Sequence, residues 1–174
     1  ELKSYLTDRY IADLMRAAPL HDIGKVAISD VILLKPGPLT EEERLTMQRH
    51  TEYGADTLSQ IEERLGFQSF IRIAVEIARH HHERWDGAGY PGNLAGEDIP
   101  LSARIMALAD VYDALRSERP YKESMSHDES RDIIVWGRGT QFDPAVVDAF
   151  LAYEEQFAFV SAFTDEGVES IRFR

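Results

Sequence analysis

The chain has 174 residues, 44% of them hydrophobic, which is enough for one well-buried domain and too short for two ordinary ones. Its formal net charge of −12 argues against a general affinity for nucleic acid polymers, which bind basic surfaces. With no cysteine, the chain can form no disulfide, and any metal must be held by nitrogen and oxygen atoms. We expect a cytoplasmic protein, because the sequence has neither a membrane-spanning apolar run nor the pattern of a signal peptide.

The patterning predicts a helical chain. Apolar residues recur at helical spacing from Leu6 to Ala18. Residues 35–38 (KPGP) form a clear break, after which Thr40 and Glu43 match a helix capping box. The helix that follows is expected to be interrupted at Gly54 and then to resume.

The second half continues this pattern. A buried helix is predicted over residues 70–78, and a loop over residues 87–100, which contain four glycines and two prolines. Asp143 is the expected cap of a late helix that starts at Pro144. Further helices are predicted over residues 102–115, 126–136 and 144–157. The sequence therefore indicates an all-α fold, a single helical bundle with a long Gly/Pro-rich loop, and a short C-terminal tail (158–174) that is extended or forms a short strand.

Two short segments carry most of the side chains suited to chemistry. His21 and Asp22 lie where an apolar helix runs into Gly24. His81 and His82 come at the end of the predicted buried helix, where a protein core has little use for two neighbouring polar rings. Because adjacent helical residues point about 100° apart, the first pair either flanks one ion or places its carboxylate between two.

Two isolated residues extend this set. Asp110 lies in an apolar context, where an unpaired carboxylate is costly, so it either coordinates a metal or forms a salt bridge. His50 lies within a predicted helix, as a ligand or as an ordinary surface or core histidine. Together, four imidazoles and two carboxylates suffice for two metal ions that share a bridging aspartate, with positions left for water.

These residues resemble the HD-GYP family. The segments 21–25 (HDIGK), 81–83 (HHE) and 86–91 (DGAGYP) are similar to its signature motifs. Further similar segments are residues 109–115, 119–122 and 139–144. HD-GYP proteins are a subgroup of the HD metal-dependent phosphohydrolases and are known as bacterial cyclic di-GMP phosphodiesterases. The resemblance implies an HD-type helical bundle over residues 1–157.

The resemblance also implies roles for individual residues. The implied metal ligands are His21, Asp22, His50, His81, His82 and Asp110. Asp22 would bridge two divalent ions, iron or manganese, with zinc, nickel and magnesium as alternatives, and would act in catalysis with Lys25. Substrate contacts would come from Lys25, Gly89, Tyr90, Arg119 and Lys122. Arg119 could instead form a salt bridge at a helix end.

One departure from the family pattern concerns an upstream ligand. Members generally have another metal-binding histidine on a helix before the His-Asp motif, and residues 1–20 contain no histidine. We expect that helix to precede residue 1, after a sensory or receiver domain, unless this member lacks it. A diguanylate cyclase domain is a further expected partner, bound through the Gly-Tyr-Pro loop.

Three functions are compatible with the sequence. The first is a phosphodiesterase that opens cyclic di-GMP to pGpG and onward to GMP. The second is a regulatory module that binds cyclic di-GMP, or a diguanylate cyclase, with little catalysis. The third is an HD-superfamily phosphohydrolase that acts on another nucleotide. The intact Gly89-Tyr90-Pro91 sequence, with Arg119 and Lys122, favours the first.

Overall fold

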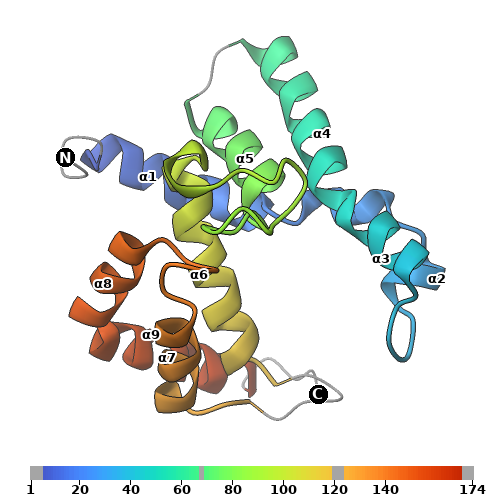
Figure 1. Cartoon of the computed structure of the whole chain (residues 1–174). Helices are drawn as coiled ribbons and strands as arrows, with labels where there is room; N and C mark the ends of the chain where they lie inside the picture. Colours follow the sequence, from blue (N-terminus) through green and yellow to red (C-terminus); the bar gives the residue numbers. More distant parts are fainter. Residues whose placement is uncertain (1–5, 67–68, 119–123, 170–174) are drawn as a thin grey trace. The chain divides into compact units, whose positions relative to one another are not determined.

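The structure, a computed structural model, describes residues 6–66, 69–118 and 124–169, with side chains as far as residue 161 (Figure 1). These residues form helices and no β-strand, so the all-α prediction is confirmed. The α-helices are α1 (Asp8–Ala17), α2 (Asp30–Leu33), α3 (Glu41–Gln48), α4 (His50–Leu65), α5 (Ser69–His80), α6 (Leu101–Arg116), α7 (His127–Trp136), α8 (Pro144–Ala152) and α9 (Glu154–Glu169). Short 3₁₀ helices are η2 (Ala18–Leu20), η3 (Ile23–Ala27) and η4 (Gly96–Asp98).

The chain divides into two compact units, Glu1–Met106 and Ala107–Arg174. The first is built on α1, α4 and α5, and its apolar core cluster consists of the buried side chains Ala17, Leu58, Ile71, Ile73, Ala74, Ile77 and Ala78. The second has its own core of Leu108, Tyr112, Ile134, Phe142, Val147 and Phe150. Each unit therefore buries a separate apolar cluster, and the predicted domain boundary at residue 157 stays a prediction.

Side-chain caps explain where several helices begin. Thr40 and Glu43 form the predicted capping box at α3, with reciprocal hydrogen bonds of 3.3 and 2.7 Å. Ser126 forms the same device at α7, and Asp143 caps α8 ahead of Pro144. These bonds satisfy backbone N–H groups that have no partner within the helix.

A close contact between η3 and α4 places the His-Asp motif. A side chain at Gly24 would overlap the carbonyl oxygen of His50, and one at Gly54 would lie 3.1 Å from the Gly24 nitrogen. The prediction that Gly54 interrupts the helix is wrong, because α4 runs without a break from His50 to Leu65. Gly54 serves instead to let another backbone segment approach the helix.

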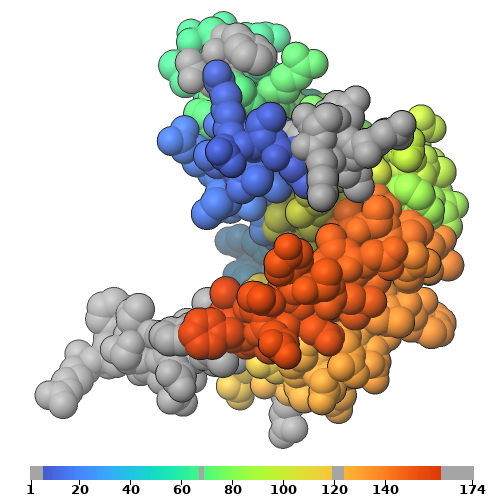
Figure 2. Space-filling model, turned by 90° about the vertical axis from the view of Figure 1, so that its left-hand side faces the viewer, coloured from blue at the N-terminus to red at the C-terminus, as the bar shows by residue number. Residues whose placement is uncertain are grey.

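The prediction of an extended arm or strand for residues 158–174 is wrong for residues 158–169, which lie in α9. The alternation that suggested a strand begins only at Val168, whereas tertiary packing holds the start of the helix. The ring of Phe157 lies 4.9 Å from that of Phe150 and 5.6 Å from that of Tyr112. Figure 2 shows the surface formed by α8 and the described part of α9 in orange and red.

No helix in the described part of the chain is both long enough and apolar enough to cross a lipid bilayer.

Candidate metal centre

Four side chains of the first unit converge on one point. Ligand atoms of Asp22, His50, His81 and His82 all lie within 4.8 Å of one another. The aspartate precedes η3, His50 opens α4, and the two adjacent histidines follow α5, so three segments far apart in sequence supply the cluster. Helix α4 packs against both α5 and η3, which holds these segments together (Figure 1).

The imidazole rings are oriented by backbone carbonyls of the preceding turn. Nδ1 of His50 lies 2.7 Å from the Met47 oxygen, and Nδ1 of His81 lies 2.9 Å from the Ile77 oxygen. A carbonyl only accepts hydrogen bonds, so Nδ1 carries the proton and the Nε2 lone pair faces the cluster. Metal-binding histidines are commonly fixed in this way.

The atoms that face one another have no hydrogen-bond partner in the described structure. They are the buried atoms Asp22 Oδ1, His50 Nε2 and His81 Nε2. Buried polar atoms without partners are costly, and a cation among three such acceptors would satisfy all of them. The residues present therefore fit a divalent ion held by nitrogen and oxygen ligands.

The two oxygens of Asp22 face different neighbours. Oδ1 lies 3.4 Å from His50 Nε2 and 3.9 Å from His81 Nε2. Oδ2 lies 3.2 Å from His21 Nε2 and 2.5 Å from Lys25 Nζ. Burial alone would raise the pKa of Asp22, but its contacts with His21 and Lys25 outweigh that effect and lower the pKa well below its usual range. The carboxylate is thus anionic and presents one oxygen to each side.

Burial keeps the cluster histidines neutral. It lowers the pKa of His81 to about 4 and, with the neighbouring imidazoles, that of His82 to about 2. Burial also lowers the pKa of His50. Neutral imidazole is the form that binds a metal, so these three rings are ready to coordinate at pH 7.

Glu83 anchors the Gly-Tyr-Pro loop. Its carboxylate is buried, with 3% of the residue exposed. It accepts hydrogen bonds from the N–H groups of Gly92 at 2.6 Å and Leu94 at 3.1 Å. Nδ1 of His80 lies 3.7 Å from this carboxylate, and burial lowers the pKa of His80. A single carboxylate therefore ties the loop to the end of α5.

The loop in turn contacts a cluster histidine. A side chain at Gly89 would overlap the backbone of residues 82–84, so glycine is required where the loop crosses this segment. The Tyr90 N–H donates to the His82 carbonyl at 3.2 Å, and the Tyr90 ring stacks on the His82 ring with centroids 4.8 Å apart. Tyr90 therefore covers one side of the cluster.

A pocket of about 410 Å³ lies beside this tyrosine. Its wall on the helix side comes from the junction of α3 and α4, and its other wall is the Gly-Tyr-Pro loop. The lining residues are Leu45, Gln48, Arg49, Glu52, Ala88, Gly89, Tyr90, Pro91 and Asn93. This size falls within the range of small-ligand sites, about 300–1,000 Å³.

The predicted site residues fall into three groups. The first unit brings together His21, Asp22, Lys25, His50, His81, His82, Gly89 and Tyr90. Asp110 lies on α6, in the second unit, and its role as a metal ligand stays a prediction. Arg119 and Lys122 lie outside the described residues.

Sequence reasoning missed the roles of Glu83, Arg49 and Glu52. Glu83 directly follows the paired histidines, and a carboxylate before a Gly/Pro-rich loop is a signal that could have drawn attention to loop anchoring. Arg49 and Glu52 are near His50 in sequence, but one and two residues away they do not share its face of the helix, so no local pattern marked them. The fold was needed to show that the loop lies opposite them.

Comparisons with known proteins agree with this geometry. A model of the HD domain family matches residues 2–146. The chain therefore belongs to the HD domain family, and its motifs are those of the HD-GYP subgroup.

Individual relatives are consistent with this assignment. The chain is 57% identical, over 93% of its length, to a cyclic di-GMP phosphodiesterase of Vibrio cholerae serotype O1. It is 45% identical, over 87% of its length, to a 3′3′-cGAMP-specific phosphodiesterase of the same organism. These alignments cover 33% and 28% of the relatives, so the chain spans about a third of their length. A crystal structure of a cyclic GMP-AMP specific phosphodiesterase of V. cholerae matches 92% of this chain and 42% of its own, with a TM-score of 0.57 and 22% identity, which supports the fold.

Proposed function

We propose that this chain is the catalytic domain of a metal-dependent phosphodiesterase that hydrolyses cyclic di-GMP. One water opens the ring at a P–O bond to give linear pGpG, and a second hydrolysis gives two molecules of GMP. The name of the relative that is 57% identical supports the choice of substrate.

The observation that carries the proposal is the position of Asp22 between two sets of side chains. Its Oδ1 faces His50 and His81, while its Oδ2 faces His21. In this proposal Asp22, His50, His81 and His82 would hold one ion, and His21 and Asp110 are proposed as further metal ligands. Two divalent ions, when bound, would supply a nucleophile at neutral pH and Lewis-acid stabilisation of the phosphodiester. Iron or manganese suits the nitrogen and oxygen ligands, and zinc, nickel and magnesium are alternatives.

The remaining residues have binding roles in this proposal. Lys25 forms an ion pair with Asp22, yet 41% of its side chain is exposed. Its ammonium group is therefore also accessible to a phosphate of the substrate. Arg119 and Lys122 are proposed as further phosphate contacts. Gly89 and Tyr90, which line the neighbouring pocket, are proposed as further substrate contacts.

Two alternatives differ in what the site does with its ligand. A regulatory module would bind cyclic di-GMP, or a diguanylate cyclase through the Gly-Tyr-Pro loop, without hydrolysis. A phosphodiesterase for another cyclic dinucleotide is supported by the relative named as specific for 3′3′-cGAMP. An upstream sensory or receiver domain and a cytoplasmic location belong to the same proposal.

The test is an assay of the anaerobically purified chain with ferrous or manganous ion and cyclic di-GMP, with products separated by chromatography. We expect pGpG to appear and metal analysis to find about two ions per chain. Cyclic di-GMP that binds but is recovered intact would support the regulatory alternative. Faster hydrolysis of 3′3′-cGAMP than of cyclic di-GMP would support the other.

A further inference from the structure

We infer that the pocket between the α3–α4 junction and the Gly-Tyr-Pro loop binds a guanine base, and that Arg49 and Glu52 select guanine over adenine. The inference rests on the proposed function in one respect: the metal centre must hold the phosphate of the same nucleotide. It adds the base specificity of that site.

The pocket adjoins the candidate metal centre through two direct links. Arg49, which lines the pocket, immediately precedes His50 of the cluster. Tyr90, which lines its opposite wall, stacks on His82 of the cluster. A nucleotide whose phosphate lies at the cluster therefore has its base within reach of this pocket.

The polar lining matches the edges of guanine. Arg49 offers only donors, and guanine presents two acceptors, O6 and N7, to which arginine commonly binds in bidentate fashion. Glu52 offers only acceptors, and guanine presents the N1–H and N2–H donors on its pairing edge. Adenine places a lone pair at N1, which would face the carboxylate of Glu52, so the same lining disfavours it.

Local packing holds these two side chains on one surface. The Arg49 guanidinium lies over the ring of Tyr53, 4.7 Å from its centroid, which limits its freedom before a ligand binds. Glu52 comes three residues after Arg49, so both project from the same side of the helix start. The apolar Leu45 and the ring of Tyr90 provide surface for the faces of the base.

This specificity has a consequence for whole substrates. A single guanine pocket accepts any cyclic dinucleotide that contains at least one guanine, and it rejects one that contains two adenines. The relatives named for cyclic di-GMP and for 3′3′-cGAMP both act on guanine-containing molecules. Discrimination between those two substrates would then depend on how the second base is held.

The experiment measures binding of GMP, AMP and IMP to the Mn²⁺-loaded chain by calorimetry. We expect GMP to bind at least about tenfold more tightly than AMP, as expected for one bidentate contact. IMP lacks the N2 amine and should bind about tenfold more weakly than GMP, a measurement that needs no variant. Equal affinity for all three nucleotides would overturn the inference.

Two substitutions assign the effect to the named side chains. Glu52→Gln should narrow or reverse the ratio of GMP to AMP affinity, because glutamine pairs with adenine. Arg49→Ala should weaken GMP by about tenfold and change AMP less. Glu63→Gln and Arg64→Ala, exposed positions further along α4, are the matched controls and should leave the ratio unchanged.

Hydrolysis assays separate this inference from the proposed function. If the chain prefers GMP but leaves cyclic di-GMP intact, the result supports the guanine pocket and contradicts the proposed phosphodiesterase activity. If the chain hydrolyses cyclic di-GMP but its preference for GMP survives both substitutions, the result supports the phosphodiesterase activity. It would overturn the assignment of guanine to this pocket.

Discussion

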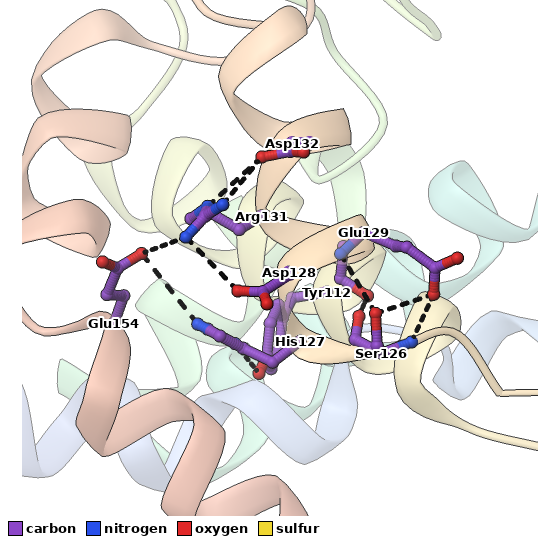
Figure 3. Close-up of polar contacts among 9 residues, drawn as sticks. Tyr112, Ser126, His127, Asp128, Glu129, Arg131, Asp132 and Glu154 are labelled. Carbon is purple, nitrogen blue, oxygen red and sulfur yellow. Dashed lines mark hydrogen bonds and ion pairs between the residues drawn. The ribbon is translucent and has the colours of Figure 1, made fainter.

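Each compact unit of this chain holds a cluster of polar side chains around histidine, and the two clusters differ in how the histidines are used. In the first cluster (Asp22, His50, His81 and His82), Nδ1 of two rings binds a backbone carbonyl, and their Nε2 atoms have no hydrogen-bond partner. In the second (Tyr112, His127, Arg131 and Glu154), protein groups face both ring nitrogens (Figure 3). Nδ1 of His127 lies 2.9 Å from the Tyr112 hydroxyl, and Nε2 lies 3.9 Å from Glu154.

Burial and charge separate the clusters further. The side chains of His50 and His81 are 2% and 0% exposed, whereas that of His127 is 20% exposed. Arg131 lies 3.8 Å from Glu154, so the second cluster contains its own cation for the carboxylate. In the first cluster Lys25 pairs with one oxygen of Asp22, but the other oxygen and the Nε2 atoms of two histidines are buried acceptors that no donor in the described structure meets, which suits an ion. In the second cluster Arg131 faces the carboxylate, and these contacts join α6, α7 and α9. The contrast teaches that several buried acceptors converging on one point, more than the presence of a histidine, indicate a metal site.

The largest effect is expected from replacing the carboxylate that the first cluster shares. Asp22→Asn keeps the shape of the side chain but removes the negative charge between the histidines and Lys25. We expect metal content to fall below half an ion per chain and cyclic di-GMP hydrolysis to drop more than a hundredfold, beyond the effect usual for residues outside the ligand shell. Metal analysis and a chromatographic assay measure the two quantities.

A surface aspartate provides the control for this change. Asp56 pairs with Arg79 at 2.7 Å, and 62% of its side chain is exposed. Asp56→Asn should alter neither metal content nor activity, because exposed ion pairs contribute at most about 1 kcal/mol. Unchanged metal binding in Asp22→Asn would show that the first cluster is not organised around this carboxylate.

A smaller effect is expected from Glu83, which touches the loop and not the cluster. Glu83→Ala removes the acceptor of the Gly92 and Leu94 N–H groups, so the free energy of unfolding should fall by about 2–4 kcal/mol. Tyr90 would then no longer be held against His82, and we expect hydrolysis to fall about 10–100-fold while metal stays bound. Denaturant unfolding, metal analysis and steady-state kinetics test this.

Glu83→Gln is the matched variant, since its amide oxygen still accepts one of the two bonds. It should recover much of the stability and activity lost in Glu83→Ala. If the alanine variant kept wild-type activity, the loop would not depend on this anchor, and the first cluster would need no support from it.

The sequence was sufficient to predict the helical fold and most of the first cluster, because both depend on local signals. Capping residues such as Thr40 and Asp143 define helix starts within a few residues of chain. Neighbouring histidines at the end of an apolar helix are equally local, and the structure brings His81 and His82 together with Asp22 and His50 as expected.

Features that depend on contacts between distant segments could not be predicted. Gly54 looked like a helix break because its role is to admit η3, which lies some thirty residues earlier in the chain. The part of α9 beyond residue 157 was missed because the rings that hold this helix come from α6 and α8. The carboxylate of Glu83 gave no sign of its partners, since the two N–H groups lie across a loop without regular periodicity.

Lowering the pH should reduce the stability of the metal-free chain through the buried histidines of the first cluster. Burial lowers the pKa of His81 to about 4, whereas the unfolded side chain titrates near 6.5. Above pH 6.5 both states are neutral and His81 contributes nothing; below it, only the unfolded chain gains the proton. The free energy of unfolding of the metal-free chain should therefore fall as the pH drops from 6.5 to 4, by up to about 3 kcal/mol from His81 alone.

Urea unfolding of the metal-free chain across this range measures the effect, and manganese sharpens it. Added Mn²⁺ should stabilise the chain at pH 7 through binding to the folded state, and this gain should vanish on acidification, because protons compete for the same nitrogens. A His81→Gln variant should show a shallower pH dependence. An identical slope in that variant would mean that the histidine is accessible to protons in the folded state.

The smallest effect is expected in the second cluster. Tyr112→Phe removes the hydroxyl bonded to His127 but keeps the ring that packs at 5.6 Å against Phe150 and Phe157. The loss of one partly buried hydrogen bond should cost about 1 kcal/mol in unfolding free energy, measured with denaturant. Metal content and cyclic di-GMP hydrolysis should match the wild type, because none of these residues belongs to the first cluster. A fall in either would break the comparison, since it would mean that the polar contacts joining α6, α7 and α9 also support the metal centre.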